Sequence, residues 1–416
     1  MFDIDKWKEI WATITRNKTR SLLTAFGVSW GLFMFILLVG FGNGFKKGIM
    51  DNFEGFAVNS CFFFTDRTGE AYKGHRKGRN WDMNSKDLRL IREKASSVEY
   101  LAPMLFADGK SVRGNKTGSY TSLGVYPDYF AMQQMIVLNG RIINEIDVSL
   151  RRKVCVIGQE VYETLFNVGE DPLGQSIRTG GIYYQVVGVV KPKSTNATIG
   201  SNPVKTVFIP FSTQQQTSNR GDEIDFLGCT AKPGCLALMV EEEVKTIIKA
   251  NHEISPTDQK ALVSINLEEE FHKINNLFSG ITVLIWIVGL GALLSGIIGI
   301  SNIMLVTVRE RMREIGVRRA IGAKPLSIIT QIMSESFVLT TLAGLAGFMA
   351  GVGILMLLQQ FMAGGQSGNG LVIIPFVSFN LALVAMAILV FSSLLAGLMP
   401  AIRALNIKAI DAIRDE

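Results

Sequence analysis

The chain has 416 residues, of which 48% are hydrophobic and only 19% are charged. With a positive mean hydropathy, this composition is typical of a membrane protein and argues against an ordinary soluble domain. The formal net charge of +6 could suggest a nucleic-acid partner, but residues 44–276 hold 28 Lys and Arg against 27 Asp and Glu. Most of the excess lies beside the apolar segments, where basic residues meet anionic lipid, so we expect no nucleic-acid binding.

The chain begins with a predicted amphipathic helix over residues 1–20, in which Trp7, Ile10, Trp11 and Ile14 recur at helical spacing among charged residues. Such a helix lies in the membrane interface, with its tryptophans at headgroup depth. The apolar segment 21–43 follows it. This segment has no small-residue cleavage site, so we interpret it as a retained first transmembrane helix rather than a signal peptide.

Three further apolar segments are long enough to cross a bilayer. A hydrocarbon core of about 30 Å needs about 20 helical residues. The three predicted transmembrane helices are residues 277–308, 328–358 and 379–400.

The distribution of Lys and Arg predicts the orientation of these four helices. Basic residues gather in 1–20, 309–327 and 401–416, whereas the short loop 359–378 has no charged residue. Basic residues near helix ends are retained on the cytoplasmic side. Both termini and the segment 309–327 are therefore predicted inside, and the long segment between the first two helices outside.

The outer segment, residues 44–276, mixes helical and strand patterns. Helices are predicted at 86–95, 158–166 and 241–253, and β-rich runs at 153–158, 183–190 and 205–211. These patterns predict an α+β domain, with one or two lobes. An apolar helical stripe lies at each end of this segment, so we predict that the first two membrane helices continue outward as a paired stalk. The first stripe is Phe41, Phe45, Ile49 and Phe53, and the second is Leu267, Phe271, Ile274 and Phe278.

All four cysteines, Cys61, Cys155, Cys229 and Cys235, fall in the outer segment. Cys229 and Cys235 flank the sequence TAKPG and could close a small disulfide loop; free, buried thiols are the alternative, and both remain open. The three histidines have no metal-ligand spacing, and no cysteine pair forms a CxxC motif. We therefore expect no catalytic or metal site and no cofactor in this chain.

The segment 309–327 packs six cations and two acids into Arg309 to Lys324, directly behind the second apolar segment. We expect that membrane helix to continue to about Glu314, to break at Gly316, and to be followed by a short helix over residues 317–321. Gly322 suits the end of a helix and Pro325 the first turn of the next. A charged segment this short could dock into a groove of a soluble partner, or its cations could serve only to set the topology.

Glu335 is the only ionised side chain within the predicted membrane helices. A carboxylate in the middle of a bilayer costs about 2.5–3.5 kcal/mol on insertion scales, so Glu335 should face protein or a cation rather than lipid. We predict an intramolecular partner near the segment 309–327.

The sequence ERMREIGVRRAIGAKPLSIITQIMSES resembles the signature of the MacB and FtsX family of ABC-transporter permeases. The family pattern is E-x-x-x-E-I-G-x-R-R-A-x-G-A, leading into a helix that bears Q-x-x-x-E. The matching positions are Glu310, Glu314, Ile315, Gly316, Arg318, Arg319, Ala320, Gly322, Ala323, Gln331 and Glu335.

The outer segment carries a second set of motifs, which is similar to the periplasmic core of MacB-like permeases. The tail PAIRA followed by AIR also resembles the close of the family, although Ala409 stands where a proline is usual. The outer motifs are GVYPDYF (124–130), NGR (139–141), Asp147, VCVIG (154–158), LF (165–166), DPLGQSI (171–177) and VVGVV (186–190).

The resemblance implies one half of a dimeric permease that is driven by an ABC ATPase. The chain has no G-x-x-x-x-G-K-[S/T] phosphate loop, so we expect ATP and Mg to be bound by a separate ATPase subunit and this chain to be non-catalytic. Ile315, Val317 and Ile321 are expected to supply apolar contact with that ATPase. The predicted ATPase-coupling residues are Arg309, Glu310, Arg313, Glu314, Ile315, Gly316, Val317, Arg318, Arg319, Ala320 and Gly322.

The resemblance also implies a location in a bacterial inner membrane and three possible functions. The first is export of a peptide, antibiotic or similar cargo, with a periplasmic adaptor and an outer-membrane channel as possible partners. The second is an FtsX-like mechanotransmitter that controls an extracytoplasmic partner such as a cell-wall hydrolase. A lipoprotein-releasing permease is the third. A membrane-bound enzyme is least supported, because no nucleophile, base or metal cluster emerges from the sequence.

Overall fold

The computed structural model describes residues 18–50, 57–194, 200–364 and 379–405. It divides into a membrane unit, Met1–Gly48 with Leu277–Glu416, and an outer unit, Ile49–Asn276. Most of the predicted interfacial helix at 1–20 and of the tail at 401–416 lies outside the described residues, as does most of the loop at 359–378. The two units are described separately below.

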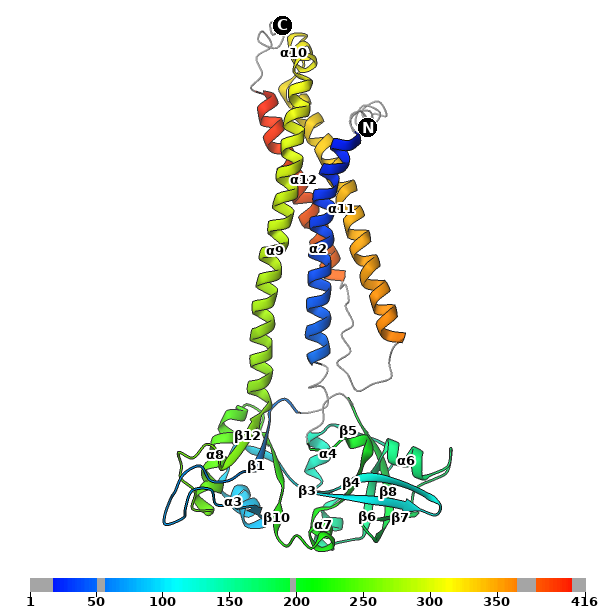
Figure 1. Ribbon diagram of the computed structural model, residues 1–416, viewed down its shortest axis with the longest axis vertical. Coiled ribbons are helices and arrows are strands. Elements are labelled where there is room, and N and C mark those ends of the chain that lie inside the picture. Colours follow the sequence, from blue (N-terminus) through cyan, green and yellow to red (C-terminus); the bar gives the residue numbers. More distant parts are fainter. Residues whose placement is uncertain (1–17, 51–56, 195–199, 365–378, 406–416) are drawn as a thin grey trace. The chain divides into compact units, whose positions relative to one another are not determined.

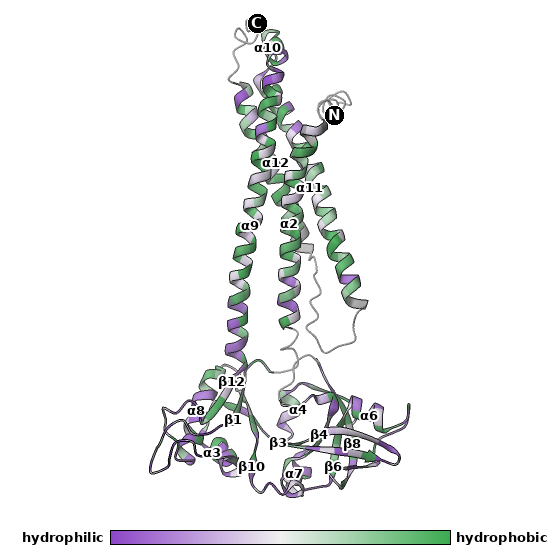
Figure 2. Ribbon diagram, in the orientation of Figure 1, coloured by the Kyte–Doolittle hydropathy of each residue, from purple (hydrophilic) through white to green (hydrophobic). Residues whose placement is uncertain are grey.

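Among the described residues, four long helices are apolar enough to cross a membrane. Figure 2 shows hydrophobic residues predominating along them, while hydrophilic residues gather where the second of the four begins. This confirms the predicted number of membrane helices and the insertion of the outer domain between the first two. The helices are α2 (Lys18–Met50), α9 (Leu267–Glu310), α11 (Pro325–Gly364) and α12 (Phe379–Leu405).

Small residues allow the membrane helices to pack closely. A Cβ atom on Gly31 of α2 would lie 3.1 Å from the carbonyl oxygen of Ala292 on α9, and one on Gly347 of α11 would lie 2.1 Å from the carbonyl oxygen of Ser29 on α2. Backbones approach in this way when dispersion has to replace the hydrophobic drive that is missing in lipid. The helices therefore run alongside one another as a bundle (Figure 1).

The predicted stalk is only partly found among the described residues. The rings of Phe45 and Phe278 lie 5.7 Å apart, centroid to centroid, and so join α2 to α9 as the two stripes predict. Leu267 differs, because it is buried in a hydrophobic cluster of the outer unit. Phe53 lies outside the described residues.

Ten strands of the outer unit form one mixed sheet among the described residues. Their order is β12-β1-β11-β3-β4-β9-β6-β8-β5, and β7 pairs with both β3 and β8. The strands are β1 (Ser60–Thr65), β3 (Val98–Arg113), β4 (Lys116–Val125), β5 (Met135–Gly140), β6 (Val154–Gly158), β7 (Ser176–Thr179), β8 (Ile182–Pro192), β9 (Thr206–Pro210), β11 (Phe226–Ala231) and β12 (Leu262–Asn266). A separate two-stranded sheet pairs β2 (Met83–Asn84) with β10 (Glu223–Ile224).

Short helices flank the sheet and cover separate hydrophobic clusters. One cluster packs α3 and α8 against β1 and β11, and another packs α6 against β6 and β8. The predicted helices at 86–95, 158–166 and 241–253 correspond to three of these, and all three predicted β-rich runs are strands. The helices are α3 (Ser85–Lys94), α4 (Asp128–Met132), α5 (Glu145–Ser149), α6 (Gln159–Leu165), α7 (Phe211–Ser218), α8 (Ala237–Asn251) and the 3-10 turn η1 (Pro203–Lys205).

The family motif around residues 139–147 builds a structural junction. Asp147 has a fully buried side chain, which accepts hydrogen bonds from the two terminal nitrogens of Arg141 at 2.5 and 3.2 Å. It also closes a capping box with Asn144 at the start of α5. Gly140 has φ +74, and a Cβ there would lie 2.2 Å from the carbonyl oxygen of Val187 on β8. The motif therefore fixes the path of the chain from β5 into α5.

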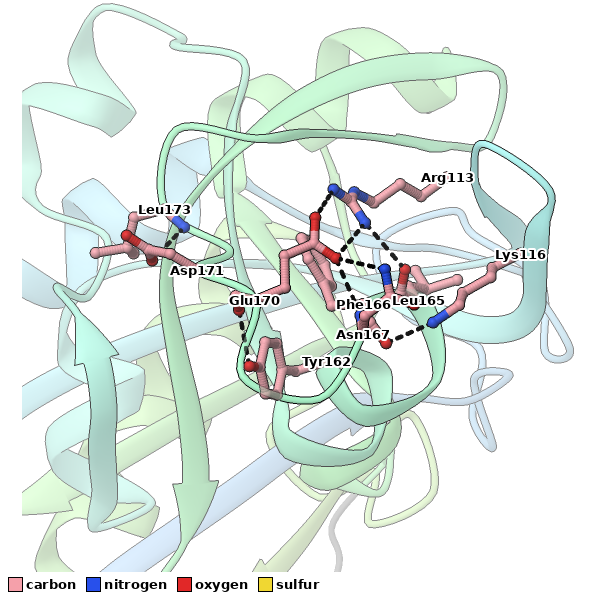
Figure 3. A network of polar contacts seen from close by, with 9 residues as sticks. All are labelled: Arg113, Lys116, Tyr162, Leu165, Phe166, Asn167, Glu170, Asp171 and Leu173. Atoms are coloured by element: carbon pink, nitrogen blue, oxygen red, sulfur yellow. Dashed lines mark hydrogen bonds and ion pairs between the residues drawn. The ribbon is translucent and has the colours of Figure 1, made fainter.

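A second polar network joins the tip of the β3–β4 hairpin to the loop after α6 (Figure 3). Arg113 forms an ion pair with Glu170, and its guanidinium lies 4.1 Å from the centroid of the Phe166 ring. Lys116 donates to the carbonyl oxygen of Phe166 at 2.6 Å, and Tyr162 donates to that of Glu170 at 2.8 Å. The hydrogen bond from Arg113 lowers the pKa of Glu170 to about 2. These contacts anchor the long hairpin.

The four cysteines are free thiols, so the disulfide between Cys229 and Cys235 is not present in this structure. Cys229 is buried within β11, directly opposite Cys61 of β1. The extended backbone continues from Cys229 to Ala231, and the chain turns only afterwards, which separates Cys235 from Cys229 along the strand. Burial raises the pKa of the Cys61 thiol to about 12 and raises that of Cys229 as well. Of the two alternatives left open by the sequence, the structure has the free thiols.

Candidate coupling site

The predicted coupling segment forms a helix, α10 (Met312–Ala320), between α9 and α11. The break after α9 falls at Arg311 instead of at Gly316, and the short helix begins earlier than the predicted 317–321. Gly316 is buried inside α10. A glycine costs only about 1 kcal/mol within a helix, which the packing of α10 can offset, so Gly316 does not end it.

The turn from α10 into α11 has the geometry that Gly322 and Pro325 predict. Gly322 has φ +99, and its N–H donates to the carbonyl oxygen of Arg319 at 3.1 Å. The N–H of Ala323 donates to the carbonyl oxygen of Arg318 at 3.0 Å. Together these bonds form a Schellman motif, which satisfies the last carbonyls of α10. Pro325 is the first residue of α11, so the chain reverses sharply.

Five polar side chains connect α10 with α11, and we call them the polar clasp: Arg311, Glu314, Arg318, Gln331 and Glu335. Arg311 Nη1 lies 3.0 Å from Glu335 Oε1, and Arg318 Nη1 donates to Gln331 Oε1 at 3.0 Å. Glu314 lies between the two arginines, 3.5 Å from Arg311 Nε and 2.8 Å from Arg318 Nη2. The Glu335 side chain is only 5% exposed and that of Arg311 is 21% exposed.

The clasp gives Glu335 an intramolecular partner at the position that the sequence predicts. A carboxylate that is almost fully buried needs a cation and hydrogen bonds to offset its desolvation. Arg311 supplies both, and it lies at the start of the coupling helix. The end of α9, the helix α10 and the first turns of α11 are therefore joined as one polar hairpin.

The predicted coupling residues separate into a buried and an exposed group. Ile315 was expected to contact the ATPase but is buried in a cluster with Val308, Ile328 and Ile332, and Gly316 is buried beside it. Arg318 and Arg319 are half-buried. The exposed members are Arg309, Glu310, Arg313, Glu314, Val317, Ala320 and Gly322. The neighbouring Ile321 is 82% exposed and Leu326 is 71% exposed, so apolar surface surrounds the Schellman turn.

Two members of the clasp, Arg311 and Gln331, were not among the predicted site residues. A signal for them was present in the spacing. Arg311 and Arg318 are seven residues apart, and Gln331 and Glu335 are four apart, so each pair lies on one face of its helix. The two arginines are donors and Gln331 and Glu335 can accept. Because a tight turn connects their two helices, this spacing would have indicated that the two pairs are in contact.

Among the described residues, no group of three His, Cys, Asp or Glu side chains is placed to bind a metal ion. The clasp carboxylates are instead engaged by arginines. The arrangement joins an exposed surface to the ends of two membrane helices through side-chain contacts.

Comparison with known proteins matches both halves of the chain. Residues 21–247 match the MacB-like periplasmic core domain, and residues 286–409 match the FtsX-like permease C-terminal domain. Among curated relatives, the macrolide export ATP-binding/permease protein MacB of Chlorobium luteolum is 29% identical over 416 residues, covering 98% of this chain and 60% of the relative. The MacB protein of Aggregatibacter actinomycetemcomitans is 27% identical over 341 residues, covering 81% of this chain and 51% of the relative.

The chain thus spans 51–60% of the length of these relatives. Among solved structures, the periplasmic region of MacB from Actinobacillus actinomycetemcomitans is 20% identical with a TM-score of 0.43, covering 53% of this chain and 95% of that chain. The extracellular domain of the ABC-type transporter YknZ is 17% identical with a TM-score of 0.41, covering 50% of this chain and all of that chain. Since the periplasmic-core match alone covers more than half of the residues, the protein belongs to the MacB/FtsX family of ABC-transporter permeases.

Proposed function

We propose that this chain couples ATP hydrolysis by an ABC ATPase, carried outside these 416 residues, to motion of its periplasmic domain. In this proposal α10 and both termini lie on the cytoplasmic side of a bacterial inner membrane, as the basic residues indicate. The exposed face of α10 docks into the ATPase. A change in docking energy between nucleotide states is what would move the membrane helices.

The observation that carries this proposal is the polar clasp. An exposed surface can drive a helix only if it is joined to it stiffly, and the clasp joins α10 to both α9 and α11 through the Arg311–Glu335 ion pair. α9 is one helix from Leu267 to Glu310, so it provides a continuous rod from the coupling segment to the outer unit. A displacement at α10 would thereby be passed along α9.

We further propose that the working unit is a dimer of such permease chains and that its cargo is a peptide, antibiotic or similar molecule. The relatives named macrolide export proteins support export as the first candidate. A periplasmic adaptor and an outer-membrane channel would be needed to carry cargo beyond the periplasm. The match of residues 286–409 to the FtsX-like permease domain supports a second candidate, control of an extracytoplasmic partner by mechanical motion.

The coupling role is tested by exposed residues that make no bond within the clasp. Arg313→Glu combined with Ile321→Glu changes the charge and the apolar surface of the docking face. In nanodiscs with its ATPase, we expect this variant to lose most of the permease-dependent ATP hydrolysis. Arg403→Glu, an exposed cation at the end of α12, is the matched control and should retain it.

Unchanged ATP hydrolysis in the double variant, with the protein folded by circular dichroism, would remove the coupling assignment. The two candidate functions are then separated by transport. Export predicts that a labelled cargo binds to the outer unit and is released in step with ATP hydrolysis. Mechanical control predicts an ATP-dependent change in the outer unit without any binding of cargo.

A further inference from the structure

A groove of about 1070 Å³ lies in the outer unit between α8 and the strand β12. One helical stripe of α8 forms a wall of the groove, and residues 262–264 of β12 also line it. The charged lining residues are three lysines and three glutamates, so the groove does not suit a polyanion such as nucleic acid. The α8 residues of the wall are Glu242, Lys245, Thr246, Lys249 and Ala250.

β12 is the edge strand of the large sheet. It pairs with β1 on one side, from Cys61 opposite Asn266 to Thr65 opposite Leu262. On its other side, no strand pairs with it among the described residues. An edge of this kind presents unpaired N–H and C=O groups, and an extended peptide can add to it as a further strand. A groove along such an edge, with a helix as its wall, fits an extended chain.

Lys249 is a buried cation in this groove that lacks a carboxylate partner among the described residues. It is only 8% exposed, and its ammonium donates to the carbonyl oxygen of Pro256 at 3.0 Å. The acids near it are engaged elsewhere. Asp258 accepts from four backbone N–H groups, and Glu70 accepts from the hydroxyl of Thr257 at 2.7 Å.

The ammonium group of Lys249 therefore has capacity for another acceptor. It carries three donors, of which one is used by Pro256. Burial, and secondarily the charge of Lys245, lowers the pKa of Lys249, which means that its charged form is under-stabilised in this structure. A carboxylate entering the groove would provide the missing stabilisation.

The direction of α8 places this cation at one end of the edge strand. Glu241, near the start of α8, accepts from the side chains of Ser264 and Asn266, toward the end of β12. Lys249, two turns further along α8, is bonded to Pro256, in the loop that leads into β12. α8 and β12 thus run in opposite directions, and Lys249 lies at the Leu262 end. A peptide that runs antiparallel to β12 would bring its carboxyl terminus to this end.

We propose that this groove binds the C-terminal segment of another extracytoplasmic polypeptide. The segment adds to β12 as an antiparallel strand, and its terminal carboxylate is held by Lys249. This binding site is independent of the coupling role proposed for α10, since all its residues belong to the outer unit. It would let the outer unit recruit a partner through a sequence-tolerant backbone contact and one charge.

The test uses the full chain in nanodiscs and a fluorescein-labelled hexapeptide of alternating threonine and valine, which favours extended structure. The peptide is prepared with a free C-terminal carboxylate and, separately, with a C-terminal amide. Fluorescence anisotropy should show the free acid binding at least about tenfold more tightly than the amide, as expected for a hydrogen bond to a charged group. Lys249→Met should abolish this difference, Lys249→Arg should retain it, and Lys86→Met, an exposed lysine outside the groove, should leave it unchanged.

Hydrogen exchange on the same samples provides the second measurement. Binding of the free acid should slow exchange at residues 262–266, because their outward amides become bonded. Equal affinity of acid and amide for the unchanged protein would overturn the proposal, as would no binding of either at millimolar concentration. Displacement of the peptide by acetate at comparable concentration would show a simple anion site instead. Protection confined to other strands would place the peptide elsewhere.

Discussion

Substitution of Arg311 tests whether the polar clasp stabilises the membrane unit. Arg311→Met keeps the length and helix propensity of the side chain but removes the cation that lies 3.0 Å from the carboxylate of Glu335, a side chain only 5% exposed. Removal of one partner of a buried ion pair lowers the free energy of unfolding by about 3–5 kcal/mol. Because the Arg311 side chain is 21% exposed, water screens part of the ion pair. We therefore expect a loss of unfolding free energy at the lower end of this range, about 3 kcal/mol.

Substitution of Glu335, the other partner of the ion pair, should lower the free energy of unfolding by less. Glu335→Met leaves Arg311 with Glu314, whose Oε2 lies 3.5 Å from Arg311 Nε, so we expect about 1 kcal/mol. The double variant Arg311→Met with Glu335→Met replaces the pair by apolar groups and should recover most of the loss. Unfolding in mixed detergent micelles, followed by tryptophan fluorescence, gives the four free energies. Arg313→Met, an exposed residue of α10, is the control and should change stability by less than about 0.5 kcal/mol. Strictly additive losses in the double variant would refute the reasoning.

Three further predictions concern the outer unit. Burial acts to raise the pKa of Asp147, but hydrogen bonds from Arg141 and the capping-box backbone outweigh it and hold that pKa below its ordinary value. The stability from this carboxylate is therefore present above about pH 4 and is lost as the pH falls further, so the melting-temperature gap between wild type and Asp147→Asn should narrow below that pH. Gly181→Ala, at φ +86 with open space around it, should lower the free energy of unfolding by about 1–2 kcal/mol. Gly140→Ala should lower it by about 1–3 kcal/mol more, because its Cβ would meet a carbonyl oxygen at 2.2 Å. Chemical denaturation measures both losses. Maleimide labelling of the native protein, followed by peptide mass analysis, should modify Cys235 well before the three buried cysteines; equal rates would contradict the packing of β11.

The membrane helices and several outer elements could be predicted from the sequence because their signals are local. An apolar stretch or a β-branched run carries its own information about burial. The hairpin of β3 and β4 was not predicted. β3 contains Pro103 and the pair Asp108–Gly109, which usually indicate turns, yet the strand continues through them. Gly109 allows a close approach, since a Cβ there would lie 3.3 Å from the backbone nitrogen of Gly180. That contact comes from a segment distant in sequence, which local reasoning does not include.

The location of the coupling segment could be predicted from the sequence, but the role of each of its residues could not. Its cations look equivalent in the sequence, whereas the structure turns Arg311 and Arg318 inward to the clasp and leaves Arg309 and Arg313 exposed. Ile315 was expected on the docking face and is buried, because helix α10 begins before Gly316 and therefore presents a different face. Which side of a short helix is covered depends on its neighbours, and those neighbours lie on α11 and α12.

The pairing of β1 with β12 has a mechanical consequence. β1 is the first strand after α2 and β12 is the last before α9, and Cys61 lies opposite Asn266, so both membrane connections leave from the same end of this strand pair. A force that pulls the two strands in opposite directions along their length would load the pair in shear, with its hydrogen bonds sharing the force. A force that pulls the two strands apart sideways would instead break these bonds one by one. The strand pair should therefore resist a force along the strands much better than a force across them.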